Sequence, residues 1–147
     1  MPIEQIHPMA AHFPIALLIT SIFLDFLGFI TKKDTFEKSA FHILVLGILG
    51  AVGAIIFGLI AEDVASKRPN IGETIETHET LAFITTGIFI ALLIIRYIFM
   101  KKDNFQKIRP YYFIGALIGI ILLFATARFG GQMVFEYGAA VSENILK

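Results

Sequence analysis

The stretch SAFHILVLGILGAVGAIIFGLIA, residues 39–61, decides the fold class of this protein. It contains no Asp, Glu, Lys or Arg. It is also long enough to cross the roughly 30 Å hydrocarbon core of a bilayer as one helix, which takes about 20 residues. Three further apolar runs flank it, at 13–30, 78–100 and 111–134. The sequence therefore predicts an all-α integral membrane protein whose four spans form a four-helix bundle.

The composition of the whole chain agrees with a membrane protein. Of its 147 residues, 56% are hydrophobic and 16% are charged, and the mean hydropathy is +0.78. Soluble domains carry about 25% charged residues, so the polar residues here are too few to cover a water-exposed surface. The length predicts one four-span domain over residues 1–147.

Charge and cysteine content exclude several classes of protein. Twelve basic and twelve acidic residues cancel, so no nucleic-acid partner is expected. The absence of cysteine excludes disulfides, Cys-ligated zinc, iron–sulfur clusters and covalent c-type haem. No phosphate-binding loop and no Ser–His–Asp pattern is present. We therefore expect a binding or electron-transfer subunit rather than a stand-alone enzyme, and any metal would need His, Met, Tyr or carboxylate ligands.

The distribution of Lys and Arg predicts the orientation in the membrane. Two connectors, 31–38 and 101–110, hold eight basic residues together with the adjoining helix ends, and the opposite side holds four. The eight are Lys32, Lys33, Lys38, Arg96, Lys101, Lys102, Lys107 and Arg109, and the four are Lys67, Arg68, Arg128 and Lys147. The positive-inside rule then places both termini and the middle connector outside the cytoplasm. The expected location is the inner membrane of a prokaryotic cell, with several spans.

Three of the four histidines fall on that outer side. His7 and His12 lie at the start of the first span, and His78 lies at the start of the third. Because Pro14 cannot donate a helical hydrogen bond, the helix either begins near His12 or continues, kinked, through this region. In a continuous helix, five residues turn the His7 and His12 rings about 140° apart. In neither case do these two rings bind one ion side by side.

Histidines from two helices of a bundle can hold a haem between them, with one imidazole on each side of the iron. We expect His12 and His78 to be the axial ligands of one haem b near the outer face. His7 would support a second site or a quinol pocket. Arg128 and Arg68 are the candidate partners of the haem propionates, together with Lys67 on the nearby connector.

Two charged residues inside the spans have structural alternatives. An arginine at the depth of Arg128 needs a partner or must reach the interface, and the acidic pair at 62–63 is the alternative to a propionate. Asp25 lies near the cytoplasmic end of the first span. We expect it to bond a neighbouring helix or the lysines of the first connector rather than to form part of a proton pathway.

Small residues predict where helices approach closely. Gly50, Ala54 and Gly58 recur on one face of the second span, and Gly115 and Gly119 form a GxxxG pattern in the fourth. In the outer half of the second span, Gly58 and its neighbour Gly53 would leave room for a flat cofactor.

Four stretches carry a resemblance to a known family. HPMAAHFPIALL (7–18) resembles the HP-x-x-x-HFP-x-ALL signature of small bacterial four-helix membrane proteins of unknown function. GAVGAIIFGLIAEDV (50–64), THETLA (77–82) and ARFGGQMVFEYGAAV (127–141) are similar to the family's second helix, third-helix histidine and ending. The resemblance covers the whole chain.

This resemblance implies a redox role. Family members are similar to small two-haem b-type cytochromes, and related domains occur joined to Rieske or c-haem modules. The resemblance implies that His7, His12 and His78 are candidate ligands, since each matches its motif. The family ending has histidine where this chain has Tyr137, so we expect one haem rather than two.

The leading hypothesis is thus a b-type cytochrome subunit that relays electrons between quinol or a membrane partner and an extracytoplasmic acceptor. One alternative is a cofactor-free structural or assembly subunit of a membrane complex. Another is a non-haem metal-binding protein that uses His7, His12, His78 and the acidic residues near them. In each case the expected partners are membrane lipid and a redox protein or larger membrane complex.

Overall fold

The computed structural model describes residues 3–101 and 104–141, which form four long helices. These are α1 (Ile3–Thr31), α2 (Asp34–Ala65), α3 (Gly72–Lys101) and α4 (Phe105–Phe135). The described residues form no strand, which confirms the all-α prediction. Of the basic residues in the charge count, Lys102 and Lys147 lie outside the described residues.

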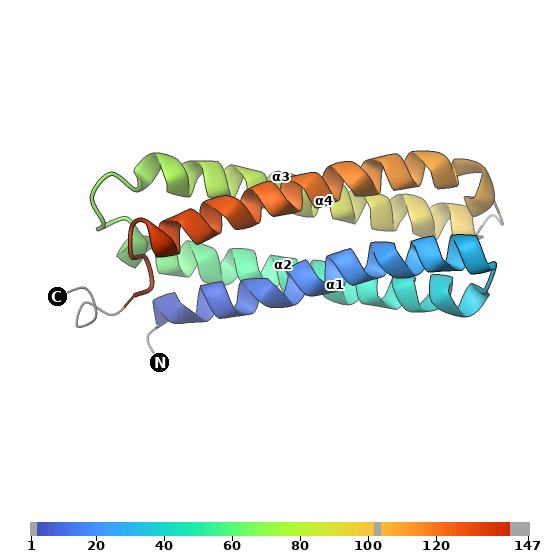
Figure 1. Ribbon diagram of the computed structural model, residues 1–147, viewed down its shortest axis with the longest axis horizontal. Coiled ribbons are helices and arrows are strands. Elements are labelled where there is room, and N and C mark those ends of the chain that lie inside the picture. Colours follow the sequence, from blue (N-terminus) through green and yellow to red (C-terminus); the bar gives the residue numbers. More distant parts are fainter. Residues whose placement is uncertain (1–2, 102–103, 142–147) are drawn as a thin grey trace.

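The four helices are arranged as two antiparallel hairpins (Figure 1). Helix α1 packs mainly along α2, and α3 packs mainly along α4, while contacts between the two hairpins are fewer. Helices α1 and α3 run in the same direction, so their N-terminal ends lie at the same end of the bundle (Figure 1). Residues near the starts of these two helices are thereby brought to one level.

Helix α1 begins well before the first predicted span and continues through Pro8 and Pro14. Of the two alternatives at Pro14, the chain therefore adopts the helix that continues. A proline inside a helix removes a hydrogen bond, and packing against a neighbouring helix supports the interrupted stretch. Pro14 is buried, and a Cβ added to Gly50 of α2 would lie 3.5 Å from its ring.

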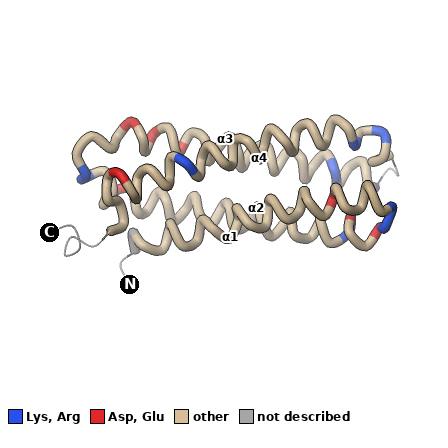
Figure 2. The backbone as a smooth tube through the Cα atoms, viewed as in Figure 1, with Lys and Arg blue, Asp and Glu red and all other residues tan. Residues whose placement is uncertain are grey.

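The outer surface of the bundle is suited to lipid. All four helices are long and apolar enough to cross a membrane. Large apolar side chains on each helix are exposed, among them Phe23, Leu49, Ile94 and Ile121. Charged residues gather at the two ends of the bundle (Figure 2). The chain is a multi-pass membrane protein.

Glycines set the close contacts within each hairpin. A Cβ on Gly47 of α2 would lie 2.8 Å from the Leu18 side chain on α1. A Cβ on Gly119 of α4 would lie 3.1 Å from the Phe89 ring on α3, and one on Gly115 would lie 3.0 Å from a neighbouring leucine. The close approach that the GxxxG pattern predicts is therefore present. Leu18 and Phe89 are fully buried and belong to the main hydrophobic core.

A buried polar cluster joins the helices at the end where α1 and α3 finish. Arg96 of α3 forms an ion pair with Asp25 of α1, and both side chains are almost completely buried. The Tyr112 hydroxyl of α4 donates to Asp25 at 3.0 Å. Arg96 also donates to the Glu37 carbonyl at 2.5 Å, and Arg109 pairs with the Glu37 carboxylate at 2.6 Å. Asp25 thus bonds a neighbouring helix, as expected, and its partner is an arginine that the charge count had assigned to the cytoplasmic surface.

Candidate functional site

A cavity of about 480 Å³ lies at the opposite end of the bundle, where α1 and α3 begin. This volume is within the range of about 300–1,000 Å³ that is usual for ligand and cofactor sites. All four helices line it, and its walls are mostly apolar. Small residues dominate the walls, namely Ala11, Ala51, Ala54, Gly58, Ala61, Ala82, Ala127, Gly130 and Gly131.

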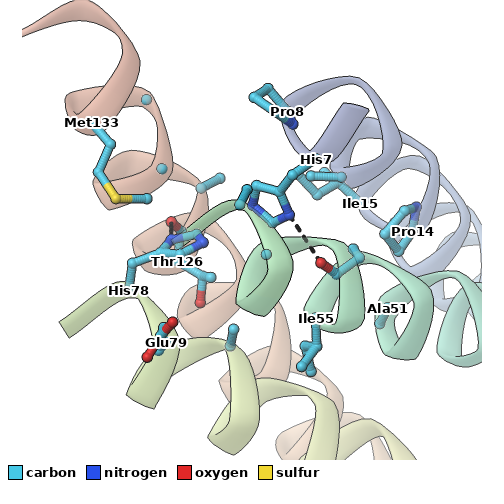
Figure 3. Close-up of a pocket in the computed structure, with 18 of the residues that line it drawn as sticks. His7, Pro8, Pro14, Ile15, Ala51, Ile55, His78, Glu79, Thr126 and Met133 are labelled. Carbon is cyan, nitrogen blue, oxygen red and sulfur yellow. Dashed lines mark hydrogen bonds between the residues drawn. The ribbon is translucent and has the colours of Figure 1, made fainter. Parts of the chain in front are cut away.

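Two imidazoles face each other in this cavity, one from each hairpin. The ring centroids of His7 on α1 and His78 on α3 lie 6.0 Å apart, and the ring planes are nearly perpendicular, at 86°. Both side chains are half-buried. Figure 3 shows the two rings on opposite sides of the space, with one nitrogen of each ring directed toward the other ring.

The second nitrogen of each ring is held by a backbone carbonyl. Nδ1 of His7 lies 2.9 Å from the Ala54 carbonyl oxygen on α2, and Nδ1 of His78 lies 2.9 Å from the Thr126 carbonyl oxygen on α4. Because a carbonyl oxygen only accepts, Nδ1 must carry the proton in both rings. The Nε2 atoms then keep a free lone pair, which is the form in which histidine binds a metal ion.

A glycine lies beside each of these rings. A Cβ on Gly58 would be 3.0 Å from Cε1 of His7, and a Cβ on Gly130 would be 3.1 Å from Cε1 of His78. Both distances are shorter than ordinary contacts, so a larger residue would displace the ring. The room that the sequence predicted at Gly58 is present and is used by the imidazole itself. A Cβ on Gly53, in contrast, would meet nothing within 4 Å.

His12 lines the same cavity but is held differently. Its Nδ1 lies 2.6 Å from the Pro8 carbonyl oxygen of its own helix, and its side chain is exposed. The ring that lies next to His78 is therefore that of His7. The expected separation of the two rings on α1 accounts for this, since His7 is directed toward α2 while His12 is exposed.

The expected propionate partners do not line the cavity. Arg128 is exposed, and no ion pair joins it to another residue within 3–101 or 104–141. Arg68 donates to the Val141 carbonyl at 3.2 Å. Tyr137, at the position where the family has histidine, packs against a small cluster of Ile71, Ile75 and Ala139.

The donor set at the cavity favours one class of metal group. Within the described part of the chain, no group of three or more His, Asp or Glu side chains is placed to hold a metal ion. Two imidazoles that bind one ion from opposite sides at about 2 Å have ring centres about 6 Å apart. His7 and His78 have this spacing. They thus fit a metal whose remaining ligands come from a flat macrocycle.

Comparison with known proteins gives one match. A family model described as "Predicted membrane protein (DUF2231)" matches residues 4–143. No curated protein and no solved structure matches the chain.

Proposed function

We propose, from the premise that the chain belongs to the predicted membrane protein family DUF2231, that it is a b-type cytochrome subunit with one haem held by His7 and His78. The facing pair of imidazoles, one from each hairpin at a centroid distance of 6.0 Å, is the observation that carries this proposal. It replaces the expected His12–His78 pair by His7–His78, because His7 is the ring that faces His78.

The residues around the two rings support this role. The Ala54 and Thr126 carbonyls orient the imidazoles and keep both Nε2 atoms unprotonated. The apolar walls of the cavity exclude water, which would favour retention of an apolar macrocycle. Bound haem supplies a one-electron redox couple, whose potential the ligands and their hydrogen bonds tune. We infer that the protein relays electrons between quinol or a membrane partner and an extracytoplasmic acceptor.

The alternative of a cofactor-free assembly subunit leaves one feature of the site unexplained. A purely structural histidine in an apolar setting normally uses its polar atoms in hydrogen bonds. Among the described residues, no hydrogen bond engages Nε2 of His7 or of His78. A protein-ligated metal site built on His7, His12 and His78 lacks a third side chain placed beside the facing pair. The role of Arg68 and Arg128 toward propionates stays a prediction from the sequence alone.

The test of the proposed function is an absorption spectrum. The detergent-purified protein, produced with ample haem, is expected to give a sharp b-type α band in the dithionite-reduced minus oxidised spectrum, at one haem per chain by pyridine haemochrome assay. A colourless protein under these conditions would refute the cytochrome proposal.

The proposed orientation has a test of its own, which the natural absence of cysteine makes direct. Single cysteines at Asn70, between α2 and α3, and at Lys33, between α1 and α2, would both be exposed. In intact cells a membrane-impermeant maleimide is expected to label Asn70→Cys, and to label Lys33→Cys only after permeabilisation. Labelling of Lys33→Cys alone in intact cells would reverse the orientation and place the histidine end at the cytoplasm.

A further inference from the structure

The two connectors within the hairpins repeat one sequence. The turn between α1 and α2 begins KKDTFEK (32–38), and the turn between α3 and α4 reads KKDNFQK (101–107). These stretches differ at two positions, and both changes, Thr to Asn and Glu to Gln, are conservative. A shared turn sequence between two hairpins of similar helix lengths suggests that one hairpin is a copy of the other.

The contacts inside the two hairpins match position by position. One shift in numbering relates three residues of α1 to residues of α3, and a shift one residue larger relates three residues of α2 to residues of α4. The pairs are His7 with His78, Leu18 with Phe89, Asp25 with Arg96, Gly47 with Gly119, Ala54 with Thr126, and Gly58 with Gly130.

The equivalent residues make equivalent contacts. Each histidine bonds the carbonyl of its paired residue at 2.9 Å, and each lies against the paired glycine four residues further on. Each of Leu18 and Phe89 packs on the paired glycine in mid-bundle. The turns differ by two to three residues in position from these shifts, which falls in the helix ends and leaves the contacts in register.

We propose that the chain consists of two copies of one helical hairpin, related by an approximate two-fold axis along the bundle. We also propose that each copy contributes an equivalent half-site, in which a carbonyl and the glycine four residues later are the positioning residues of the histidine. This proposal rests on the proposed function only for the identity of the group between the rings. The positioning itself is a property of the chain.

Helix geometry explains why the carbonyl and the glycine occur together. In an α-helix the carbonyl of residue i accepts the N–H of residue i+4, so the side chain of i+4 lies beside that oxygen. An imidazole that donates to the Ala54 carbonyl must therefore lie over residue 58, and one that donates to the Thr126 carbonyl must lie over residue 130. Glycine at i+4 removes the Cβ that would block this approach, and the contact distances of 3.0 and 3.1 Å show that the space is fully used.

The Asp25–Arg96 pair fits the same relation. These residues occupy equivalent positions in the two hairpins and face each other across the proposed axis. Two identical copies would place like charges together in a buried site, which is strongly unfavourable. Opposite charges at this one position let the two copies of a single chain pair with each other.

The test uses Gly58→Ala and Gly130→Ala in the full-length protein, with Gly53→Ala and Gly87→Ala as controls. A Cβ at either control position meets nothing within 4 Å. The first readout is ¹⁵N NMR of histidine-labelled protein without haem, with His7→Gln and His78→Gln to assign signals. We expect both rings as the Nδ1–H tautomer in the unsubstituted protein. Gly58→Ala should remove that signal for His7 alone, and Gly130→Ala for His78 alone.

The second readout is the EPR spectrum of oxidised, haem-loaded protein. Either glycine variant should shift the low-spin g values in the same direction, and the controls should leave them unchanged. If one glycine variant alters its ring signal and the other does not, the half-sites are not equivalent and the proposal is wrong. It is also wrong if neither variant alters a ring. Absence of haem would refute the proposed function, while the NMR result would still decide the half-sites.

Discussion

Replacement of His7 or His78 by alanine is expected to abolish the b-type absorption band, whereas His12→Ala is expected to keep it. Each of the two facing rings would supply one axial ligand, and loss of either leaves the iron five-coordinate and high-spin or prevents haem retention. His12 is exposed and bonded to its own helix, so its removal leaves the facing pair intact. The three variants, purified in parallel, are compared by reduced minus oxidised spectra and by haem content per chain.

Two controls sharpen this comparison. His42→Ala removes an exposed ring bonded to the Lys38 carbonyl at the far end of the bundle, and it should leave the spectrum unchanged. In His7→Gly and His78→Gly, added imidazole should restore a six-coordinate low-spin spectrum, which a merely structural histidine would not require. A band that survives His7→Ala but is lost in His12→Ala would instead support the pair that the sequence alone favoured.

Replacement of Arg96 by methionine is expected to destabilise the protein by about 3–5 kcal/mol, because it leaves the Asp25 carboxylate buried without its partner. Asp25 and Arg96 are almost completely buried, and Asp25 would keep only the hydrogen bond from Tyr112. Such a change lowers the unfolding temperature in detergent, followed by circular dichroism at 222 nm.

The double variant Asp25→Leu with Arg96→Met provides the matched control. Replacing a buried ion pair by apolar residues of similar size is often neutral or stabilising, so the double variant should recover most of the stability that Arg96→Met loses. If Arg96→Met alone unfolds at the same temperature as the unsubstituted protein, the ion pair does not hold the hairpins together.

The sequence anticipated part of the candidate site, and the geometry explains the part it missed. His7 and His78 were both recognised, because their positions at the starts of parallel spans follow from hydropathy and proline signals that are local in the chain. The choice between His7 and His12 as the partner of His78 depends on the direction of each ring around α1. That direction is set by the rotation of α1 against α2, which the contacts at Gly47, Gly50 and Gly58 fix.

The same distinction holds at the other end of the bundle. Asp25 was expected to find a partner on a neighbouring helix, but Arg96 was counted among the surface charges because it lies close to a lysine-rich turn. Its burial results from the position of Glu37 and Tyr112 around it, and no local pattern in the sequence contains that information.

By itself, then, the sequence determined that this protein is all-α, that it crosses a membrane four times, and that three of its histidines lie at one end. These properties follow from the length and apolar character of each segment, which are local. Only the tertiary structure decided that His7 faces His78, that Asp25 pairs with Arg96, and that the two hairpins make equivalent contacts. Each of these depends on how helices far apart in the chain rotate and approach, and that is settled by packing against glycine and by the pairing of buried polar groups.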